Sequence, residues 1–303
     1  MKLHVLHDNP DWYPPFADAF EAEGVEHEQW LLGEGTLDLA AEPPSGLYWS
    51  RVSASSPLRG HPAAKDHARA VLSWLEAHGR HVVNGRRVLE LEMSKADQLS
   101  ALRACGIDVP ETVVAVGRAG LLAAAGKLRT PFIVKPNQGG KGLGVHRFDT
   151  LAQFADYVDS PGYEPPVDGI TLIQEYLRAA EPRITRVELV GGEYLYALTA
   201  DTARGGFELC PAEACDVSAR SLFALRRDFD GHPLIRQYEQ FAARTGIGIA
   251  GFEFIETEDG RVVTYDVNAT TNYNPQVDAE AAVSGPRRVA RHLKSLLADI
   301  KEE

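Results

Sequence analysis

Hydrophobic residues over the first ninety positions alternate between two spacings. Short apolar runs at 3–6 and 47–49 have the length of strands, whereas apolar residues three or four positions apart at 15–23 and 63–78 are typical of helices. Gly79 directly follows the second helical stretch, where helices commonly end. The pattern predicts a small α/β domain over residues 1–92.

The alternation resumes after residue 93. Ser94 has the character of a helix N-cap, with Asp97 three positions later, and predicts a helix that ends near Gly106. Periodicity then predicts a second α/β unit over 93–174, with strands and helices in turn at 112–116, 118–127, 131–136, 145–148, 151–159 and 170–177.

Two turn signals mark the last third of the chain. Gly191-Gly192 separates the apolar runs 185–190 and 194–199, and Asp259-Gly260 separates 249–255 from 262–267. Further periodic segments predict helices at 233–245 and 287–300. The third unit, 175–303, is therefore expected to be mixed, and the whole chain is expected to have an α/β fold with α+β character.

Composition limits the partners and the cellular compartment that we expect for this protein. The formal charge of −12 disfavours nucleic acid and acidic membranes as partners, because both are polyanions. No apolar run approaches the roughly 20 residues of a membrane-spanning helix, and the N-terminus is too polar for a secretory signal. Three cysteines, Cys105, Cys210 and Cys215, are expected to be free thiols in a reducing compartment, so we expect a cytoplasmic protein.

The densest chemical signal is a glycine-rich loop. The strand at 131–136 carries Lys135, and four glycines follow within six positions: Gly139, Gly140, Gly142 and Gly144. Glycines allow successive backbone N–H groups to turn toward one anion, so the loop is a candidate phosphate cover, although a glycine loop alone is more typical of a flexible surface hairpin. It lacks the hydroxyl residue and the following helix of a Walker A motif.

A second signal consists of oxygen-bearing side chains near the C-terminus. Asp266 and Asn268 are two positions apart, so they share one face of a strand, and a hairpin partner can place Glu253 on that face. Magnesium prefers such oxygen ligands. An isolated pattern of this kind is common in turns, but together with the upstream loop it favours a metal–nucleotide site.

These two motifs resemble those of the ATP-grasp superfamily, and the chain resembles its α-L-glutamate ligase branch over most of its length. The resemblance implies an ATP-grasp fold with an N-terminal Rossmann-like pre-ATP-grasp domain, a lid subdomain over 93–174 and a metal-binding subdomain over 175–303. Further segments match that branch in order and spacing: Tyr48-Trp49-Ser50-Arg51, Trp74 to Gly79, Val83-Asn84, Ser94-Lys95, Gly106-Ile107, Val109-Pro110 and Gln174 to Leu177.

The resemblance also implies roles for individual residues. Lys95 and Lys135 would hold nucleotide phosphates beneath the glycines, and Glu253, Asp266 and Asn268 would bind magnesium, with manganese as the alternative ion. The adenine would be met by Gln174, Glu175, Tyr176 and Leu177, and the ribose by Glu181, because Ile184 replaces the usual acid. Two arginines complete the expected site: Arg186 at the transferring phosphoryl group and Arg51 at a substrate carboxylate.

Some positions depart from the branch. Glu208-Leu209-Cys210 stands where the glutamate ligases carry an Arg-Ser-Asn-like segment. The acids Glu253 and Asp266 occur in the reverse order, and residues 269–274 replace a Ser-Pro-Gly turn. The resemblance therefore implies ATP and metal binding but does not single out glutamate as the substrate.

The activity implied is an ATP-dependent carboxylate–amine ligase that forms an amide through an acyl phosphate. Its partners would be a small-molecule carboxylate and amine, with a peptide or protein acceptor and a homo-oligomer left open. Two alternatives remain at this point: an ATP-grasp kinase that stops after phosphoryl transfer, and a nucleotide-binding module without catalysis. A Rossmann oxidoreductase is disfavoured, because no glycine fingerprint occurs near Asp8.

Overall fold

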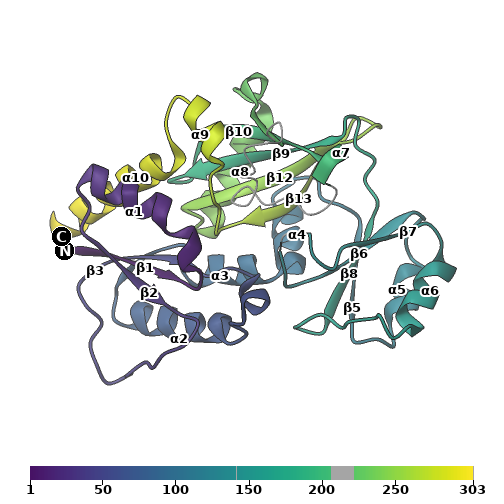
Figure 1. The fold of residues 1–303 in the computed structure, drawn as a ribbon, viewed down its shortest axis with the longest axis horizontal. Coiled ribbons are helices and arrows are strands. Elements are labelled where there is room, and N and C mark those ends of the chain that lie inside the picture. The colour runs from purple at the N-terminus through teal and green to yellow at the C-terminus, as the bar shows by residue number, and fades with distance from the viewer. Residues whose placement is uncertain (141, 206–221, 303) are drawn as a thin grey trace.

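A computed structural model describes residues 1–140, 142–205 and 222–302. Within these ranges the chain forms three sheets, which lie around a shared central region (Figure 1). Cys210, Cys215 and the departure at 208–210 lie outside the described residues. No helix in the described ranges is both long and apolar enough to cross a membrane.

The first sheet has four parallel strands in the order β2-β1-β3-β4: β1 Lys2–His7, β2 His27–Leu31, β3 Gly46–Arg51 and β4 His81–Val83. Helix α2 (Ala64–Ala77) packs on the face that carries Leu6 and Tyr48. Helix α1 (Pro14–Glu23) packs on the opposite face. The expected strands and helices of this unit are confirmed. Strand β2, whose positions are all half-buried or exposed, and α3 (Arg86–Met93) were not predicted.

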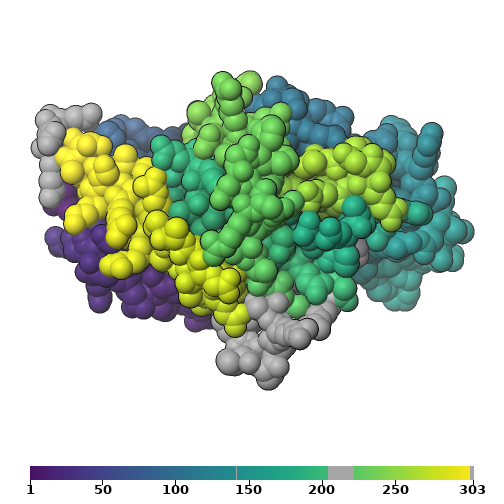
Figure 2. Space-filling view, turned by 90° about the horizontal axis from the view of Figure 1, so that it is seen from above, coloured from purple at the N-terminus to yellow at the C-terminus, as the bar shows by residue number. Residues whose placement is uncertain are grey.

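The last helix returns to this first sheet. α10 (Gly285–Glu302) lies along α1 and over β1 and β3, and Figure 2 shows its yellow atoms against the purple N-terminal segment. Val289, Ala290 and Leu293 are fully buried there, in the same cluster as Leu3 and Phe20. The helix expected at 287–300 therefore exists, but it covers strands from the other end of the chain.

The central sheet has five antiparallel strands in the order β11-β10-β9-β12-β13: β9 Arg183–Val190, β10 Glu193–Asp201, β11 Phe223–Leu225, β12 Ile249–Glu256 and β13 Val262–Asn268. Helix α8 (Pro233–Thr245) covers one face, where the Tyr238 hydroxyl lies 2.7 Å from Oγ1 of Thr264. Because that face is filled by apolar contacts, the polar side chains of the strands gather on the other. Short helices α7 (Thr202–Gly205) and α9 (Pro275–Glu280) follow β10 and β13.

The third sheet has antiparallel strands in the order β5-β8-β6-β7: β5 Thr112–Val116, β6 Phe132–Pro136, β7 His146–Phe148 and β8 Ile170–Glu175. Helices α5 (Leu121–Ala125) and α6 (Leu151–Asp159) pack on one face. α5 is shorter than the predicted 118–127 because Gly120 and Gly126 flank it. Helix α4 (Lys95–Ala104) precedes this sheet and contacts β13 of the central sheet.

Candidate nucleotide and metal site

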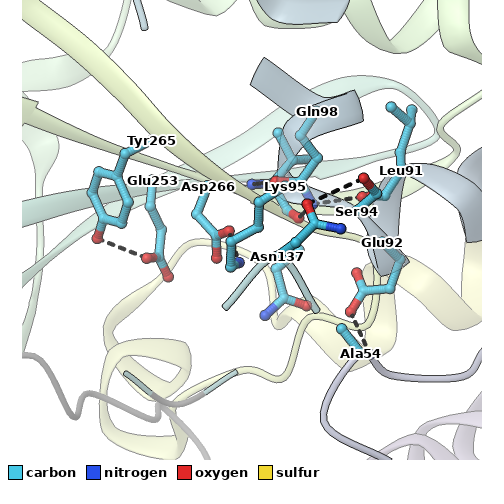
Figure 3. Close-up of polar contacts among 12 residues, drawn as sticks. Ala54, Leu91, Glu92, Ser94, Lys95, Gln98, Asn137, Glu253, Tyr265 and Asp266 are labelled. Atoms are coloured by element: carbon cyan, nitrogen blue, oxygen red, sulfur yellow. Dashed lines mark hydrogen bonds and ion pairs between the residues drawn. The ribbon is translucent and has the colours of Figure 1, made fainter. Parts of the chain in front are cut away.

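A row of charged side chains crosses three neighbouring strands of the central sheet. In the strand register Arg186 of β9 lies opposite Glu253 of β12, and Glu253 lies opposite Asp266 of β13. Directly opposite residues in a sheet share a face, so all three side chains point to the same side. Figure 3 shows Glu253 and Asp266 side by side, with Lys95 approaching Asp266.

A bulge adds a fourth member to this row. The register of β12 and β13 shifts after Glu253, which leaves Tyr265 as an extra residue in β13. A bulge can turn two successive side chains toward one face. The Tyr265 hydroxyl consequently donates a 2.8 Å hydrogen bond to Oε2 of Glu253 (Figure 3). The strict alternation assumed from the sequence did not reveal this contact.

Arg186 is held on three sides. Its Nε donates to Glu188 at 2.6 Å, Nη1 to Glu253 at 2.8 Å and Nη2 to Oγ1 of Thr271 at 2.5 Å. Only 3% of the residue is exposed; although burial lowers the pKa of a guanidinium, Glu188 and Glu253 raise that of Arg186 above its ordinary value. The guanidinium lies over Gly251, where a Cβ atom would come within 2.6 Å of Nη2.

Two lysines from different elements reach the same region. Ser94 accepts a hydrogen bond from the Asp97 backbone N–H, which caps α4 and places Lys95 in its first turn. The Lys95 ammonium forms an ion pair with Asp266, and this contact raises the pKa of Lys95 although burial acts to lower it. Lys135 arrives on β6 from the third sheet, and only 6% of it is exposed.

Lys135 is a buried cation without a counter-charge close to it in the part of the chain that the structure describes. Within the described residues no carboxylate lies at ion-pair distance from its ammonium, and the ring of Tyr265 is centred 6.0 Å away. Burial and the neighbouring charge of Lys95 lower the pKa of Lys135 to about 7. A phosphate in this position would supply the missing counter-charge.

Asn137 fixes the two lysines relative to one another. Asn137 lies two residues after Lys135. The backbone carbonyl of Asn137 accepts a hydrogen bond from Lys95 N at 3.3 Å, and its side-chain Oδ1 accepts one from Ala96 N at 2.9 Å. Its Nδ2 donates to Asp168 at 2.8 Å. Asn137 therefore ties the start of the glycine loop to the N-terminus of α4, a role that no motif in the sequence indicated.

These groups line one cavity of about 490 Å³. Most of the residues predicted for the site contribute to its wall: Lys95, Lys135, Gly139, Gly140, Gly142, Gln174, Glu175, Tyr176, Leu177, Arg186, Glu253, Asp266 and Asn268. Gly144 lies outside the wall, next to Pro136. Glu181 is also outside it, with an exposed side chain that pairs with Arg183 at 3.5 Å.

Arg51 was predicted to lie in the site, but it does not line the cavity. It is 4% exposed, and its guanidinium lies 4.1 Å from the ring centre of Phe16 and 4.8 Å from that of Trp49. Nη2 donates to the carbonyl of Thr271 at 3.0 Å and to Oδ1 of Asn272 at 2.9 Å. Burial lowers the pKa of Arg51 to about 10. Arg51 thus holds the segment after β13 through hydrogen bonds to Thr271 and Asn272.

At the expected adenine end, the carboxylate of Glu175 is already engaged. Both of its oxygens accept hydrogen bonds from Arg261 at 3.0 Å, and Oε1 accepts another from the backbone N–H of Glu111 at 2.8 Å. Tyr176 and Leu177 follow Glu175 along the same wall. The guanidinium of Arg147 lies 4.4 Å from the centre of the Tyr176 ring.

One buried acid in the wall was not predicted. Glu92 of α3 accepts hydrogen bonds from the backbone N–H groups of Ala269 at 2.7 Å and Ala54 at 3.3 Å, and from the Thr270 hydroxyl at 3.2 Å. Burial raises the pKa of this carboxyl to about 7. Figure 3 shows it next to Ala54, to which it is hydrogen-bonded. Its helix has an ordinary amphipathic sequence, so no pattern marked the position.

The chemistry of the donors fits a hard divalent cation. Glu253 and Asp266 present carboxylate oxygens, and Asn268 adds an amide oxygen that accepts a 3.0 Å hydrogen bond from Thr270 N. Among the described residues no three His, Cys, Asp or Glu side chains form a metal cluster. Magnesium needs no such cluster, because it is usually bound by one or two carboxylates together with phosphates and water.

The chain is similar to known proteins in sequence and in fold. No protein-family model matches the chain. It is 33% identical over 132 residues to an α-aminoadipate–LysW ligase of Sulfurisphaera tokodaii, covering 42% of this chain and 45% of that protein. It is 26% identical over 213 residues to a probable α-L-glutamate ligase of Enterobacter sp. strain 638, covering 67% of this chain and 64% of that protein. The matched region thus spans less than two thirds of either relative.

A solved structure carries the likeness over nearly the whole chain. The ATP-grasp ligase PsnB, complexed with a minimal precursor, Mg and ADP, superposes with a TM-score of 0.66 at 16% identity, covering 97% of this chain and 96% of PsnB. At that identity the match establishes the fold. The chain therefore has the fold of an ATP-grasp ligase, and its sequence resembles those of α-L-glutamate ligases.

Proposed function

We propose that this protein is an ATP- and magnesium-dependent carboxylate–amine ligase. The observation that carries the proposal is the convergence on one cavity of two lysines, Lys95 and Lys135, with the row formed by Arg186, Glu253 and Asp266. Cations for phosphates and oxygen ligands for a metal are the components that phosphoryl transfer requires. No nucleophilic triad is needed, because the substrate carboxylate itself attacks.

In the proposed site, Lys95 and Lys135 neutralise the nucleotide phosphates, and the loop with Gly139, Gly140 and Gly142 closes over them. Glu253, Asp266 and Asn268 would hold magnesium or, alternatively, manganese, which would screen phosphate charge when bound. The ion pair between Lys95 and Asp266 would then separate, since each partner gains a counter-charge of its own.

Arg186 is suited to the reacting phosphoryl group. Its planar guanidinium is fixed by Glu188 and Thr271 before any substrate arrives, and preorganised charge of this kind favours a transition state over a flexible ground state. In the reaction a carboxylate oxygen attacks the γ-phosphorus and ADP leaves. An amine then attacks the acyl carbon, phosphate leaves and the nitrogen loses a proton, which yields an amide.

The relatives favour amino-acid or peptide substrates. One is named for α-aminoadipate and LysW, another for glutamate, and the solved neighbour was complexed with a precursor. We extend this class of substrate to the present chain as part of the proposal. We also propose the three units 1–92, 93–174 and 175–303 as domains, with α10 reaching across from the third to the first.

The test is release of ADP from MgATP in the presence of amino acids, singly and in pairs, with mass spectrometry of the products. ADP that appears only with a particular pair, together with a conjugate lighter by one water, supports the ligase. Lys135→Ala should abolish that signal, whereas Lys127→Ala, an exposed lysine of the same unit, should retain it.

Two other results would contradict the proposal. ADP with a single substrate and a phosphorylated product would identify a kinase. Binding of MgATP without turnover for any pair would instead indicate a nucleotide-binding module.

A further inference from the structure

The segment 269–274 forms part of the cavity wall and is rigidly held. Glu92 binds its start, Arg186 contacts the Thr271 hydroxyl, and Arg51 binds the Thr271 carbonyl. These three residues come from α3, β9 and β3, so separate parts of the fold fix one segment. Asn272 of this segment lines the cavity.

The orientation of the Asn272 amide follows from its neighbour. Arginine is a hydrogen-bond donor only, so the atom that faces Nη2 of Arg51 at 2.9 Å must be the oxygen Oδ1. The nitrogen Nδ2 is then the other end of the amide. Within the described residues Nδ2 has no hydrogen-bond partner, and Asn272 is half-buried. Its two N–H donors are consequently available to a molecule in the cavity.

The charge behind this amide is uncompensated. No carboxylate in the described part of the chain lies within ion-pair distance of Arg51, and its buried Nε has no hydrogen-bond partner. The contrast with two nearby arginines is clear, since Arg59 pairs with Asp8 and Arg186 pairs with Glu188. A buried charge without a partner is costly, and an anion close to it lowers that cost.

We propose that Asn272 binds a non-reacting carboxylate of the substrate through Nδ2, and that Arg51 acts as the positioning residue that orients the amide and supplies positive charge. The inference rests on the proposed ligase function, because it concerns the substrate of the same cavity. It assigns the substrate to molecules with a free carboxylate besides the reacting group, such as amino acids and dicarboxylic acids.

The deciding variant is Asn272→Asp, because it moves stability and binding in opposite directions. An aspartate gives Arg51 its missing counter-ion, so the ligand-free variant should unfold at a higher temperature than the wild type. The same carboxylate removes both N–H donors and repels a bound anion. Affinity for a carboxylate ligand should therefore fall about tenfold or more.

The measurement is thermal unfolding in the presence of MgADP, with the twenty amino acids, their α-carboxamides, succinate and glutarate as the probes. At least one carboxylate should stabilise the wild type, its carboxamide should not, and the stabilisation should vanish in Asn272→Asp while that by MgADP is retained. Gln276→Glu is the matched control, an exposed amide-to-acid change four residues away that should alter neither quantity. Asn272→Ala should lose the carboxylate effect without the rise in unfolding temperature.

The inference is overturned if no carboxylate stabilises the wild type, if the carboxamides stabilise it equally, or if Asn272→Asp binds as well as the wild type. Equal binding of carboxamides would point to a neutral carbonyl ligand instead. Because unfolding needs no turnover, these outcomes are separate from those of the ADP assay. A stabilising carboxylate without ADP release would uphold the binding site and contradict the ligase.

Discussion

Gly251 offers the sharpest test of the row on the central sheet. A Cβ atom at this position would lie 2.6 Å from Nη2, 2.7 Å from Nε and 2.8 Å from Cζ of Arg186. Such distances are well inside van der Waals contact, so the guanidinium or the strand must move in Gly251→Ala. Arg186 has little room for this movement, because Glu188, Glu253 and Thr271 hold it and only 3% of it is exposed.

The size of the effect can be worked from these contacts. Forcing a methyl group into a packed site costs about 1–3 kcal/mol. A hydrogen bond between charged groups contributes ~1.5–3 kcal/mol to stability, and lengthening it loses part of that contribution. Arg186 makes one such bond to Glu188 and one to Glu253. We therefore expect the free energy of unfolding to fall by about 2–4 kcal/mol. A displaced guanidinium also no longer faces the phosphoryl group. We therefore expect kcat to fall about 100-fold in Gly251→Ala.

Urea unfolding gives the first quantity and ADP release under saturating substrates gives the second. Gly120→Ala is the matched control: no atom lies within 4 Å of its added Cβ and its φ is negative, so neither quantity should decrease. A Gly251→Ala protein with the kcat of the wild type would refute the argument that Arg186 must occupy this position. Equal losses in Gly120→Ala would show that the assay reports an unspecific effect.

Three further predictions concern groups around the cavity. The pKa of Glu92 is raised from 4.5 to about 7 in the folded state, so this carboxyl contributes stability that is full below pH 4.5 and is lost as the pH rises through 7. The free energy of unfolding from urea titrations should therefore fall by on the order of 3 kcal/mol between pH 4.5 and 8 because of this group, and Glu92→Gln should remove that difference. The pKa of Lys135 is lowered to about 7, so the Kd of MgATP should rise from pH 6.5 to 8.5 in calorimetry, and this rise should be absent in Lys135→Met. Asn84 has a φ of 56° and makes hydrogen bonds to Gly248, Ile249 and Ala269; Asn84→Ala should lower the free energy of unfolding by roughly 3–4 kcal/mol, and Asn84→Gly by about 1 kcal/mol less because glycine tolerates that φ.

Local pattern was sufficient for most elements. α6 and α8 begin and end at the predicted residues, and the Gly191-Gly192 turn joins β9 to β10 with positive φ at both glycines. These elements were predictable because caps, turns and periodicity act within a few residues. β2 was not, since as a parallel edge strand with only half-buried and exposed positions it owes its structure to pairing with β1.

The candidate site divides in the same way. Glu253 and Asp266 could be placed together from strand spacing and one turn, and the register agrees. Tyr265 and Glu92 could not, because a bulge breaks the period of two and because contacts between residues 92 and 269 depend on the tertiary fold. Arg51 shows the converse: its position in a motif was recognisable, but the direction of its side chain depends on Phe16 and on the segment after β13.

The return of α10 to the first sheet bears on how the chain is made. The ribosome releases β1, α1 and β3 more than 200 residues before it releases residues 285–302, whose Val289, Ala290 and Leu293 complete the same buried cluster. Until then one apolar face of the first sheet lacks part of its cover. The nascent first unit should therefore be sensitive to proteases and attractive to chaperones, and it should become resistant only once synthesis has passed α10.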